Sequence, residues 1–282
     1  MEVILDKYAG FCFGVQKAVE GVYDLIGKKD NLYTFGPVIH NESVVNDLES
    51  KGVGVINSVE ELKDINGACV VIRAHGVSRS VYEAMDENNI DCIDLTCPFV
   101  KRIHRIVSQK FEEGNQIVVV GNASHPEVIG IRGWVDGPSY AVENADDARN
   151  LSINKDIPVF IVAQTTFNTN KFKELVEIIK NKGYNVNVVD TICNATKERQ
   201  ESAGEIAQQA DVMLVIGGKN SSNTQKLFDI CAKHCPSTYH IQGVEDLNFD
   251  LPKAASLVGI TAGASTPNNI IEEVQNYVRI NF

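Results

Sequence analysis

The sequence has no long apolar run and no excess of positive charge. None of its segments approaches the roughly 18 to 20 consecutive apolar residues that a membrane-spanning helix needs. The N-terminus has no basic stretch ahead of an apolar core, so we expect no signal peptide and no membrane contact, and we predict a cytoplasmic location. The formal net charge of −11 argues against nucleic acid as a partner, because affinity for a phosphate backbone depends largely on Lys and Arg.

Low-complexity segments and long linkers are also absent, so composition does not mark domain boundaries. With 44% hydrophobic and 22% charged residues, the 282-residue chain is typical of a soluble globular protein. Apolar runs alternate with helical patterns along the chain, which indicates an α/β fold. Strands are predicted at residues 68–72, 116–120, 158–163, 185–189, 211–216 and 256–260, and helices at 100–113, 171–182, 197–210 and 268–278.

Seven cysteines are unusual in a chain without a secretion signal. An odd number argues against a disulfide framework and for reduced thiols, metal ligation or catalysis. Cys12, Cys97 and Cys193 are spaced by 85 and 96 residues (97 − 12 and 193 − 97), close to a third of 282. Each lies where a strand or loop gives way to a helix, and helix N-termini stabilise thiolates. The spacing therefore suggests three α/β units that each present one thiol.

The other four cysteines are predicted to be structural. Cys69 lies in an apolar strand and is expected to be a small buried hydrophobe, and Cys92 is expected to be similar. Cys231 and Cys235 have no second pair nearby with the spacing of a zinc site.

Three histidines occupy comparable positions. His75 and His125 follow predicted strands, His40 lies in a similar loop, and ligands of open α/β sheets gather at the carboxyl ends of strands. A single loop histidine is more often structural, whereas three in matching positions favour a site. The remaining histidines are expected on the surface, in helical or connecting segments: His104, His234 and His240.

Polar loops follow three later strands. The loops at residues 217–224 and 261–266 can bring N–H groups and hydroxyls close to a phosphate, although simple helix N-caps would have the same composition. Neither loop matches the Walker A or dinucleotide-binding spacing. A third loop offers the hydroxyls of Thr165 and Thr166. Glu127 is the carboxyl among these loops, and a carboxyl screened from water can act as a proton donor.

Eight short motifs together resemble those of the hydroxymethylbutenyl diphosphate reductase family. They occur in order across nearly the whole chain: GFCFGV at 10–15, RAHGV at 73–77, TCP at 96–98, HPE at 125–127, QTT at 164–166, TICNAT at 191–196, KNSSN at 219–223 and TAGAS at 261–265. Each motif is weak alone, and eight in order are specific. Phe13 and Ser124 depart from the family pattern, which often has a small residue and Gly there, but neither departure removes a functional group.

The resemblance implies an α/β fold of three similar units in a trefoil-like arrangement around an iron–sulfur cluster. The units would comprise residues 13–96, 97–192 and 193–282, with residues 1–12 packed on the third. Cys12, Cys97 and Cys193 would hold a 4Fe–4S cluster whose fourth iron has no protein ligand. Such an open position lets the iron bind substrate as well as carry electrons.

The resemblance also implies a reaction, the reductive dehydroxylation of 4-hydroxy-3-methylbut-2-enyl diphosphate to isopentenyl and dimethylallyl diphosphate. Glu127 and Thr165 would form the proton network, with Thr166 as the alternative to Thr165, in a pocket that His125 also lines. The diphosphate would be held by neutral donors and imidazoles instead of Arg, since hydrogen bonds to a charged acceptor are strong. These residues would be His40, His75, Ser221, Ser222, Asn223 and Ser265.

The family further implies a ferredoxin or flavodoxin as electron donor. Both carriers are typically acidic, as is this chain, so a local basic patch is needed, and Lys101, Arg102 and Arg105 are one candidate. Two other functions remain open on the residues alone. One is a zinc-dependent phosphoester hydrolase with Cys and His ligands, and the other is a non-catalytic iron–sulfur redox sensor.

Overall fold

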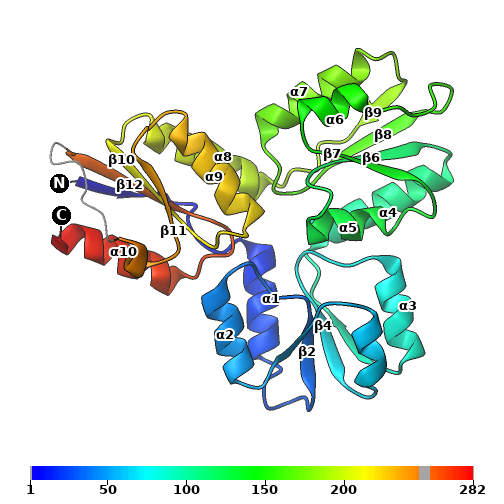
Figure 1. Cartoon of the computed structure of the whole chain (residues 1–282). Coiled ribbons are helices and arrows are strands. Elements are labelled where there is room, and N and C mark those ends of the chain that lie inside the picture. Colours follow the sequence, from blue (N-terminus) through cyan, green and yellow to red (C-terminus); the bar gives the residue numbers. More distant parts are fainter. Residues whose placement is uncertain (1, 248–254, 282) are drawn as a thin grey trace. The chain divides into compact units, whose positions relative to one another are not determined.

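A computed structural model describes residues 2–247 and 255–281, and these residues form three four-stranded parallel sheets (Figure 1). The first sheet has the order β3 (Gly54–Ile56), β2 (Leu32–Phe35), β4 (Cys69–Ile72), β5 (Asp91–Asp94). The second has the order β7 (Ser139–Val142), β6 (Gln116–Val120), β8 (Val159–Ala163), β9 (Val186–Val188). The third has the order β11 (Thr238–Ile241), β10 (Val212–Ile216), β12 (Leu257–Ala262), β1 (Glu2–Leu5). The predicted α/β class is confirmed, and each predicted strand is present to within two residues at either end.

The three sheets repeat one connectivity. In the first and second sheets, the strand that comes last in the chain, β5 or β9, is an edge strand. It pairs in parallel with the second central strand, β4 or β8. In the third sheet this place is taken by β1, which pairs in parallel with β12. The N-terminal strand therefore completes the sheet formed by the C-terminal part of the chain.

The chain forms two compact units. Unit 1 comprises Met1–Gln16, Ile39–Asn46 and Asn194–Phe282 and contains the third sheet. Unit 2 comprises Lys17–Val38 and Asp47–Cys193 and contains the first and second sheets. The predicted boundaries after residues 96 and 192 stay a prediction, because the compact units keep the first two sheets together.

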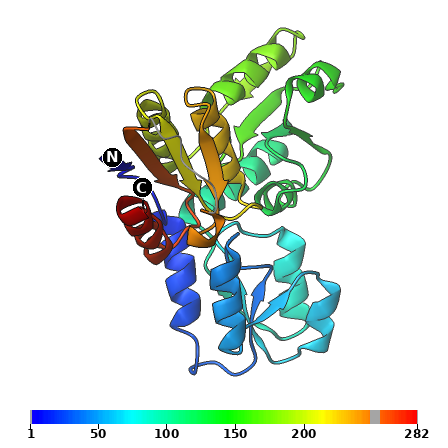
Figure 2. The same ribbon diagram turned by 60° about the vertical axis from the view of Figure 1, so that its left-hand side comes forward.

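Helices cover both faces of each sheet (Figures 1 and 2). Parallel connections need such crossovers, and the resulting sheets are buried on both sides. The helices are α1 (Phe13–Tyr23), α2 (Glu42–Ser50), α3 (Arg79–Glu87), α4 (Pro98–Glu112), α5 (Pro126–Arg132), α6 (Ala145–Asn150), α7 (Thr169–Lys180), α8 (Asn194–Ala207), α9 (Ser222–Ala232) and α10 (Asn268–Asn281), with short 3-10 helices η1 (Glu60–Asp64) and η2 (Val244–Asp246).

Alternation along the central strands divides each core into two layers. In β10, Val212, Leu214 and Ile216 pack with apolar residues of α10, while Met213 and Val215 pack with α8 and α9. In the second sheet, alternate residues of β6 and β8 face α6 and α7 on one side and α4 and α5 on the other. Successive side chains of a strand point to opposite faces, so a continuous apolar run fills both layers.

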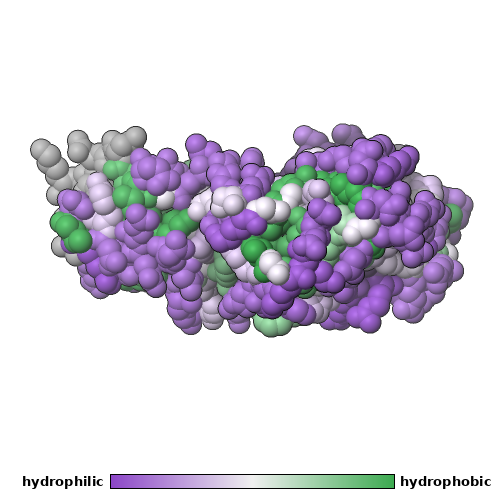
Figure 3. Space-filling view, turned by 90° about the horizontal axis from the view of Figure 1, so that it is seen from below, coloured by the Kyte–Doolittle hydropathy of each residue, from purple (hydrophilic) through white to green (hydrophobic). Residues whose placement is uncertain are grey.

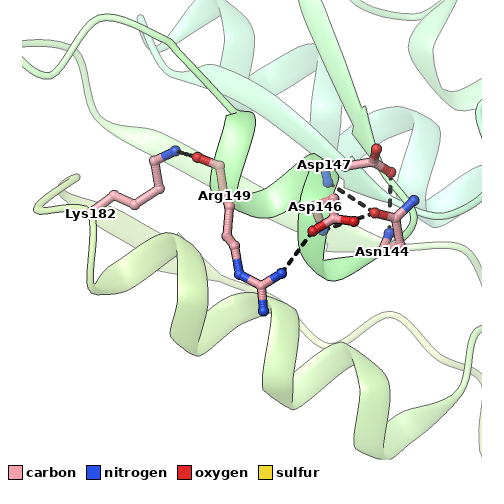
Figure 4. A network of polar contacts seen from close by, with 5 residues as sticks. All are labelled: Asn144, Asp146, Asp147, Arg149 and Lys182. Atoms are coloured by element: carbon pink, nitrogen blue, oxygen red, sulfur yellow. Dashed lines mark hydrogen bonds and ion pairs between the residues drawn. The ribbon is translucent and has the colours of Figure 1, made fainter.

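Short helices depend on their caps, and α6 shows how (Figure 4). The side chain of Asn144 accepts hydrogen bonds from the amides of Asp146 and Asp147, each at 2.9 Å, and the Asp147 carboxylate accepts the Asn144 amide at 3.2 Å. Arg149 pairs with Asp146 at 2.8 Å, and the Lys182 ammonium donates to the carbonyl of Arg149. A helix of six residues is marginal alone, so these bonds fix its start and its end.

The surface is mainly polar. On the face in Figure 3 hydrophilic residues predominate and border the hydrophobic groups. Among residues 2–247 and 255–281, the exposed large apolar side chains are Leu5, Phe13, Phe99, Ile129 and Ile280. None of the helices described is long and apolar enough to cross a bilayer.

Candidate active site

Each sheet presents three loops at the carboxyl ends of its strands, and the predicted site residues occupy all of them. The first central strands, β2, β6 and β10, precede His40, His125 and the segment 221–223. The second central strands, β4, β8 and β12, precede His75, Thr165 and Ser265. The edge strands β1, β5 and β9 precede Cys12, Cys97 and Cys193. Carboxyl ends of parallel strands meet at one edge of their sheet, so the second and third sheets each bring their own three loops together, and the first brings together the loops of His75 and Cys97.

The three cysteine loops share a turn that the sequence reading did not identify. An aspartate lies at the end of each edge strand or within two residues after it, and its carboxylate accepts the amide two residues later, a turn that Asp readily forms. The bonds are Tyr8 to Asp6 at 3.0 Å, Thr96 to Asp94 at 2.9 Å and Ile192 to Asp190 at 3.0 Å. The same aspartate turn therefore sets the backbone path of all three loops ahead of the cysteine.

Two cysteine loops are bonded to the loops that carry other predicted site residues. The Cys97 amide donates to the carbonyl of Ala74 at 3.1 Å, next to His75. The Cys193 amide donates to the carbonyl of Thr165 at 3.1 Å. Both cysteines are partly exposed and lie directly before a helix, α4 or α8. Within unit 2, backbone geometry therefore places two thiols beside two predicted substrate residues.

The two histidines of unit 2 lie against each other. The rings of His75 and His125 are edge to face, with centroids 5.4 Å apart. His125 is the N-cap of α5, and its Nδ1 accepts the amide of Glu127 at 3.1 Å. Because Nδ1 is the acceptor in this bond, a neutral His125 carries its proton on Nε2, where it can be donated to a ligand.

Glu127 is buried, with 2% of its surface exposed, and both oxygens of its carboxylate accept hydrogen bonds from Thr165. Its Oε1 accepts the Thr165 amide at 2.6 Å and its Oε2 accepts the Thr165 hydroxyl at 2.8 Å. Thr166 instead accepts a hydrogen bond from Gln164 at 3.0 Å. Glu127 lies in the first turn of α5 and not in a loop as its position after His125 suggested. The structure therefore pairs Glu127 with Thr165.

Unit 1 brings the two polar loops into contact. The hydroxyls of Ser221 and Ser265 are 3.3 Å apart, and Ser221 also caps α9 by accepting the Thr224 amide. Asn223 is 4% exposed, and within the described part of the chain neither its amide nitrogen nor its amide oxygen has a hydrogen-bond partner. An unsatisfied buried polar group costs about 1–3 kcal/mol. Asn223 therefore marks a place where a polar ligand would complete the structure.

His40 lies against the same loop. A Cβ at Gly218 would come within 2.3 Å of the His40 carbonyl oxygen, so only glycine permits this approach. The Ser221 amide in turn donates to the Gly218 carbonyl at 3.0 Å. His40, Ser221 and Ser265, which lie far apart in the sequence, are thus linked through adjoining loops of unit 1.

Arg199 in α8 is a site residue that sequence reasoning missed. It is 3% exposed, and its Nε donates to the carbonyl of Tyr8 and its Nη2 to the carbonyl of Gly10, both at 2.8 Å. Asp6 fixes the same segment by accepting from the hydroxyls of Ser202 and Thr261, both at 2.7 Å. The segment before Cys12 is therefore clamped from two sides. Nothing in the local pattern at Arg199 indicates this, since its partners are about 190 residues away.

The family resemblance implies that Cys12 holds part of an iron–sulfur cluster, and on that basis we expect the Arg199→Gln variant to hold less iron and to become less stable. Removing a buried charge that two carbonyls bind costs roughly 3 kcal/mol or more, and it releases the loop that carries Cys12. Iron per chain after anaerobic reconstitution and the melting temperature of the cluster-free protein measure the two effects. Arg199→Lys keeps the charge but not the two-pronged geometry and should show a smaller loss of iron. Unchanged iron content in Arg199→Gln would contradict this role.

Three expectations about lone residues need correction. Cys92 is exposed, because β5 is an edge strand. His104 is 3% exposed, since it lies on the inner face of α4 and stacks on Trp134. His240 is part of strand β11 and half-buried, with its Nε2 3.0 Å from the Gly217 carbonyl. His234 is exposed and Cys69 is buried, as predicted, and Cys231 and Cys235 are buried as well.

Cys69, Cys92 and Cys231, which lie outside the predicted ligand set, are held as thiols. Burial raises the pKa of Cys69, and it raises the pKa of Cys231 to about 12. The thiol of Cys92 is partly shielded from water by neighbouring protein atoms. This shielding, together with the carboxylates of Asp94 and Asp91, raises the pKa of Cys92 to about 11. Metal ligation requires the thiolate, so these positions are unfavourable for it. Cys12, Cys97 and Cys193 differ in being partly exposed at helix N-termini, which is the chemistry an iron–sulfur cluster needs.

Comparison with known proteins decides the family. The "LytB protein" family matches residues 3–279. The chain belongs to the LytB family. A 4-hydroxy-3-methylbut-2-enyl diphosphate reductase of Caldanaerobacter subterraneus subsp. tengcongensis is 45% identical, over 97% of this chain and 95% of the relative. The family resemblance carried by the eight motifs is thereby confirmed.

Two solved structures agree with this membership. A reductase from Plasmodium falciparum, named for E-1-hydroxy-2-methyl-but-2-enyl-4-diphosphate, has a TM-score of 0.92 and 29% identity, covering 99% of this chain and 87% of that one. A second structure, titled (E)-4-hydroxy-3-methyl-but-2-enyl diphosphate reductase, the terminal enzyme of the non-mevalonate pathway, has 42% identity and a TM-score of 0.70, with 99% of both chains covered.

Proposed function

We propose that this LytB-family chain reduces 4-hydroxy-3-methylbut-2-enyl diphosphate to isopentenyl and dimethylallyl diphosphate, the last step of the non-mevalonate pathway. Relatives that match it over nearly their whole length have the corresponding reductase name. The observation that carries the mechanism is the buried Glu127–Thr165 pair, since Thr165 is also bonded to the Cys193 amide. Hydrogen bonds thus link the residue with the proton source, Glu127, to the residue with the hydroxyl, Thr165, and link Thr165 to the residue with the thiol, Cys193.

The residues fit an iron–sulfur cluster held by Cys12, Cys97 and Cys193. Three thiols follow equivalent edge strands, share the aspartate turn and begin three helices, whereas the pKa of Cys69, Cys92 and Cys231 is raised. When bound, a 4Fe–4S cluster with only three protein ligands supplies electrons and a Lewis-acidic iron for the substrate hydroxyl.

Glu127 and Thr165 supply the proton that lets the hydroxyl leave as water. Thr165 donates to the Glu127 carboxylate in the structure. With Glu127 protonated, this bond reverses and the Thr165 hydrogen turns toward the leaving oxygen. The C–O bond then breaks as the allyl unit takes up two electrons and a second proton, and the position of that proton determines which product forms. His125 donates through Nε2 and orients the substrate in the same pocket.

The diphosphate is bound without Arg. The Ser221 hydroxyl, the Asn223 amide and Ser265 lie at the start of α9 and on the adjoining loop, and His40 and Ser222 extend this group. The N-terminus of α9 adds backbone N–H groups and a favourable dipole for an anion. The family resemblance adds His75 as a further imidazole donor. Together these hydrogen-bond donors offset the repulsion between the anionic diphosphate and a chain of net charge −11.

Anaerobic reconstitution with iron and sulfide, followed by an assay with the diphosphate and reduced methyl viologen, tests the proposal. A brown protein that oxidises the dye and yields both five-carbon diphosphates supports it. A brown protein without turnover would instead indicate a redox sensor. A colourless protein that binds zinc would indicate the hydrolase alternative.

A further inference from the structure

A cavity of about 430 Å³ opens in unit 2 directly beside Cys97. Its lining includes Pro98, Lys101 and Arg105 of α4, Tyr82 of α3, and Trp134 after α5. Pro98 follows Cys97 in the chain, so the rim of the cavity begins next to a proposed cluster ligand. None of these five residues takes part in the proton or diphosphate chemistry.

The walls of the cavity are aromatic and fixed. Trp134 lies 5.8 Å from Tyr82 and 5.2 Å from His104, measured between ring centroids, and its Nε1 donates to the Val77 carbonyl at 2.9 Å. Burial lowers the pKa of His104 to about 4, so this ring is neutral at physiological pH. A rigid aromatic pocket of this kind suits an apolar or aromatic anchor from a partner protein.

The rim is positive, in contrast to the chain as a whole. The solvent face of α4 carries Arg102 and Arg105, and within residues 2–247 and 255–281 neither has an acidic partner in an ion pair. They lie about 7.5 and 12 Å along the helix from Cys97, at ~1.5 Å per residue. Lys101 pairs with Asp94 at 2.6 Å and is half-exposed. No carboxylate lies on α4 before Glu112, so positive charge is concentrated at the end nearest Cys97.

An exposed aromatic residue completes the surface. Phe99, in the first turn of α4, is 54% exposed. Exposed apolar groups bordered by cations are typical of protein interfaces, in which aromatic residues and Arg are enriched. The surface formed by Phe99, Arg102, Arg105 and the Tyr82–Trp134 pocket is called the α4 surface below.

We propose that the α4 surface is the docking site for a small acidic electron-carrier protein. The inference rests on the proposed function, which consumes two electrons per substrate, while the polar loops of the chain lack the dinucleotide-binding spacing of a nicotinamide enzyme. Two carrier molecules each give up one electron and are oxidised. The two electrons and two protons enter the substrate, and one water leaves. Opposite charge at the α4 surface favours the approach of an acidic carrier to a chain of net charge −11.

The test compares a protein carrier with a dye that needs no docking. Arg102→Glu/Arg105→Glu holoenzyme is assayed with a reduced acidic bacterial ferredoxin and with reduced methyl viologen. We expect kcat/KM for ferredoxin to fall at least tenfold and the viologen rate to stay within twofold or rise, because viologen is a cation. Calorimetric titration of oxidised ferredoxin into the holoenzyme should show a matching rise in Kd. Phe99→Ser should weaken binding severalfold without affecting the viologen rate.

A matched control separates local from global charge. Lys63→Glu/Lys173→Glu changes the net charge by the same amount, on η1 and α7, and should behave like the wild type. The proposal is overturned if ferredoxin-dependent turnover of the Arg variant stays within twofold, if the Lys variant loses as much, or if the viologen rate falls equally. Wild-type protein without viologen activity would refute the proposed function instead, and the calorimetric comparison would still decide the docking site.

Discussion

Cys97→Ala and Cys193→Ala are expected to reduce the visible absorption of the reconstituted protein and its turnover to background. Each thiol is held in a loop whose backbone is bonded to a neighbouring site loop, at Ala74 or Thr165, so no other cysteine can take its place. Anaerobic iron and sulfide analysis with visible spectroscopy measures the effect. Cys12→Ala should behave in the same way.

Cys92→Ala is the matched control for this prediction. Cys92 lies five residues before Cys97, is exposed, and has a thiol pKa raised to about 11, so it should be dispensable. Full cluster content in Cys97→Ala, or loss of the cluster in Cys92→Ala, would show that the ligand set has been assigned wrongly. Melting temperatures close to that of the wild type in all variants would exclude a general loss of folding.

Glu127→Gln should lower turnover by about 10² to 10⁴, the usual contribution of a positioned acid or base. The amide has nearly the same shape and can still bond to Thr165, so cluster content and substrate affinity should be retained. Turnover with reduced viologen and binding of the diphosphate measure the two properties separately. Because proton delivery is the property lost, the remaining activity should lack the pH dependence of the wild type.

Two comparisons make this prediction specific. Glu143→Gln changes a carboxyl after β7 in the same sheet and should leave turnover intact. Thr165→Val should lose most activity, while Thr166→Val should lose much less, since the Thr165 hydroxyl is bonded to Glu127 and the Thr166 hydroxyl is bonded to Gln164. Near-normal turnover in Glu127→Gln would refute the proton-relay role.

The sequence predicted the strands well because parallel strands buried on both faces leave continuous apolar runs, such as residues 116–120 and 212–216. It also predicted the loops that carry His75, Thr165 and Ser265, because each follows such a strand. It could not predict strand order. The pairing of β1 with β12 has no local signal, and with it the fixation of the Cys12 loop by Arg199 was missed.

Errors about single residues came from the same source. Cys92 was expected to resemble the buried Cys69, yet β5 is at the edge of its sheet. His104 was expected on the surface because it lies in a helical segment, yet it lies on the face that packs against Trp134. The unpartnered amide of Asn223 likewise depends on which loops meet, and composition shows only that polar residues are present.

The position of β1 has a consequence for the order in which the protein is made. Unit 1 combines segments that are synthesised far apart in time, and Asp6 bonds to Thr261, 255 residues later. While the chain is emerging from the ribosome, the first two sheets can fold, but the Cys12 loop has neither β12 nor Arg199 to hold it. Its thiol therefore stays in an unfolded segment until β12 and Arg199 have been synthesised. Insertion of the proposed cluster would follow that point, and the nascent thiol is exposed to oxidation until then.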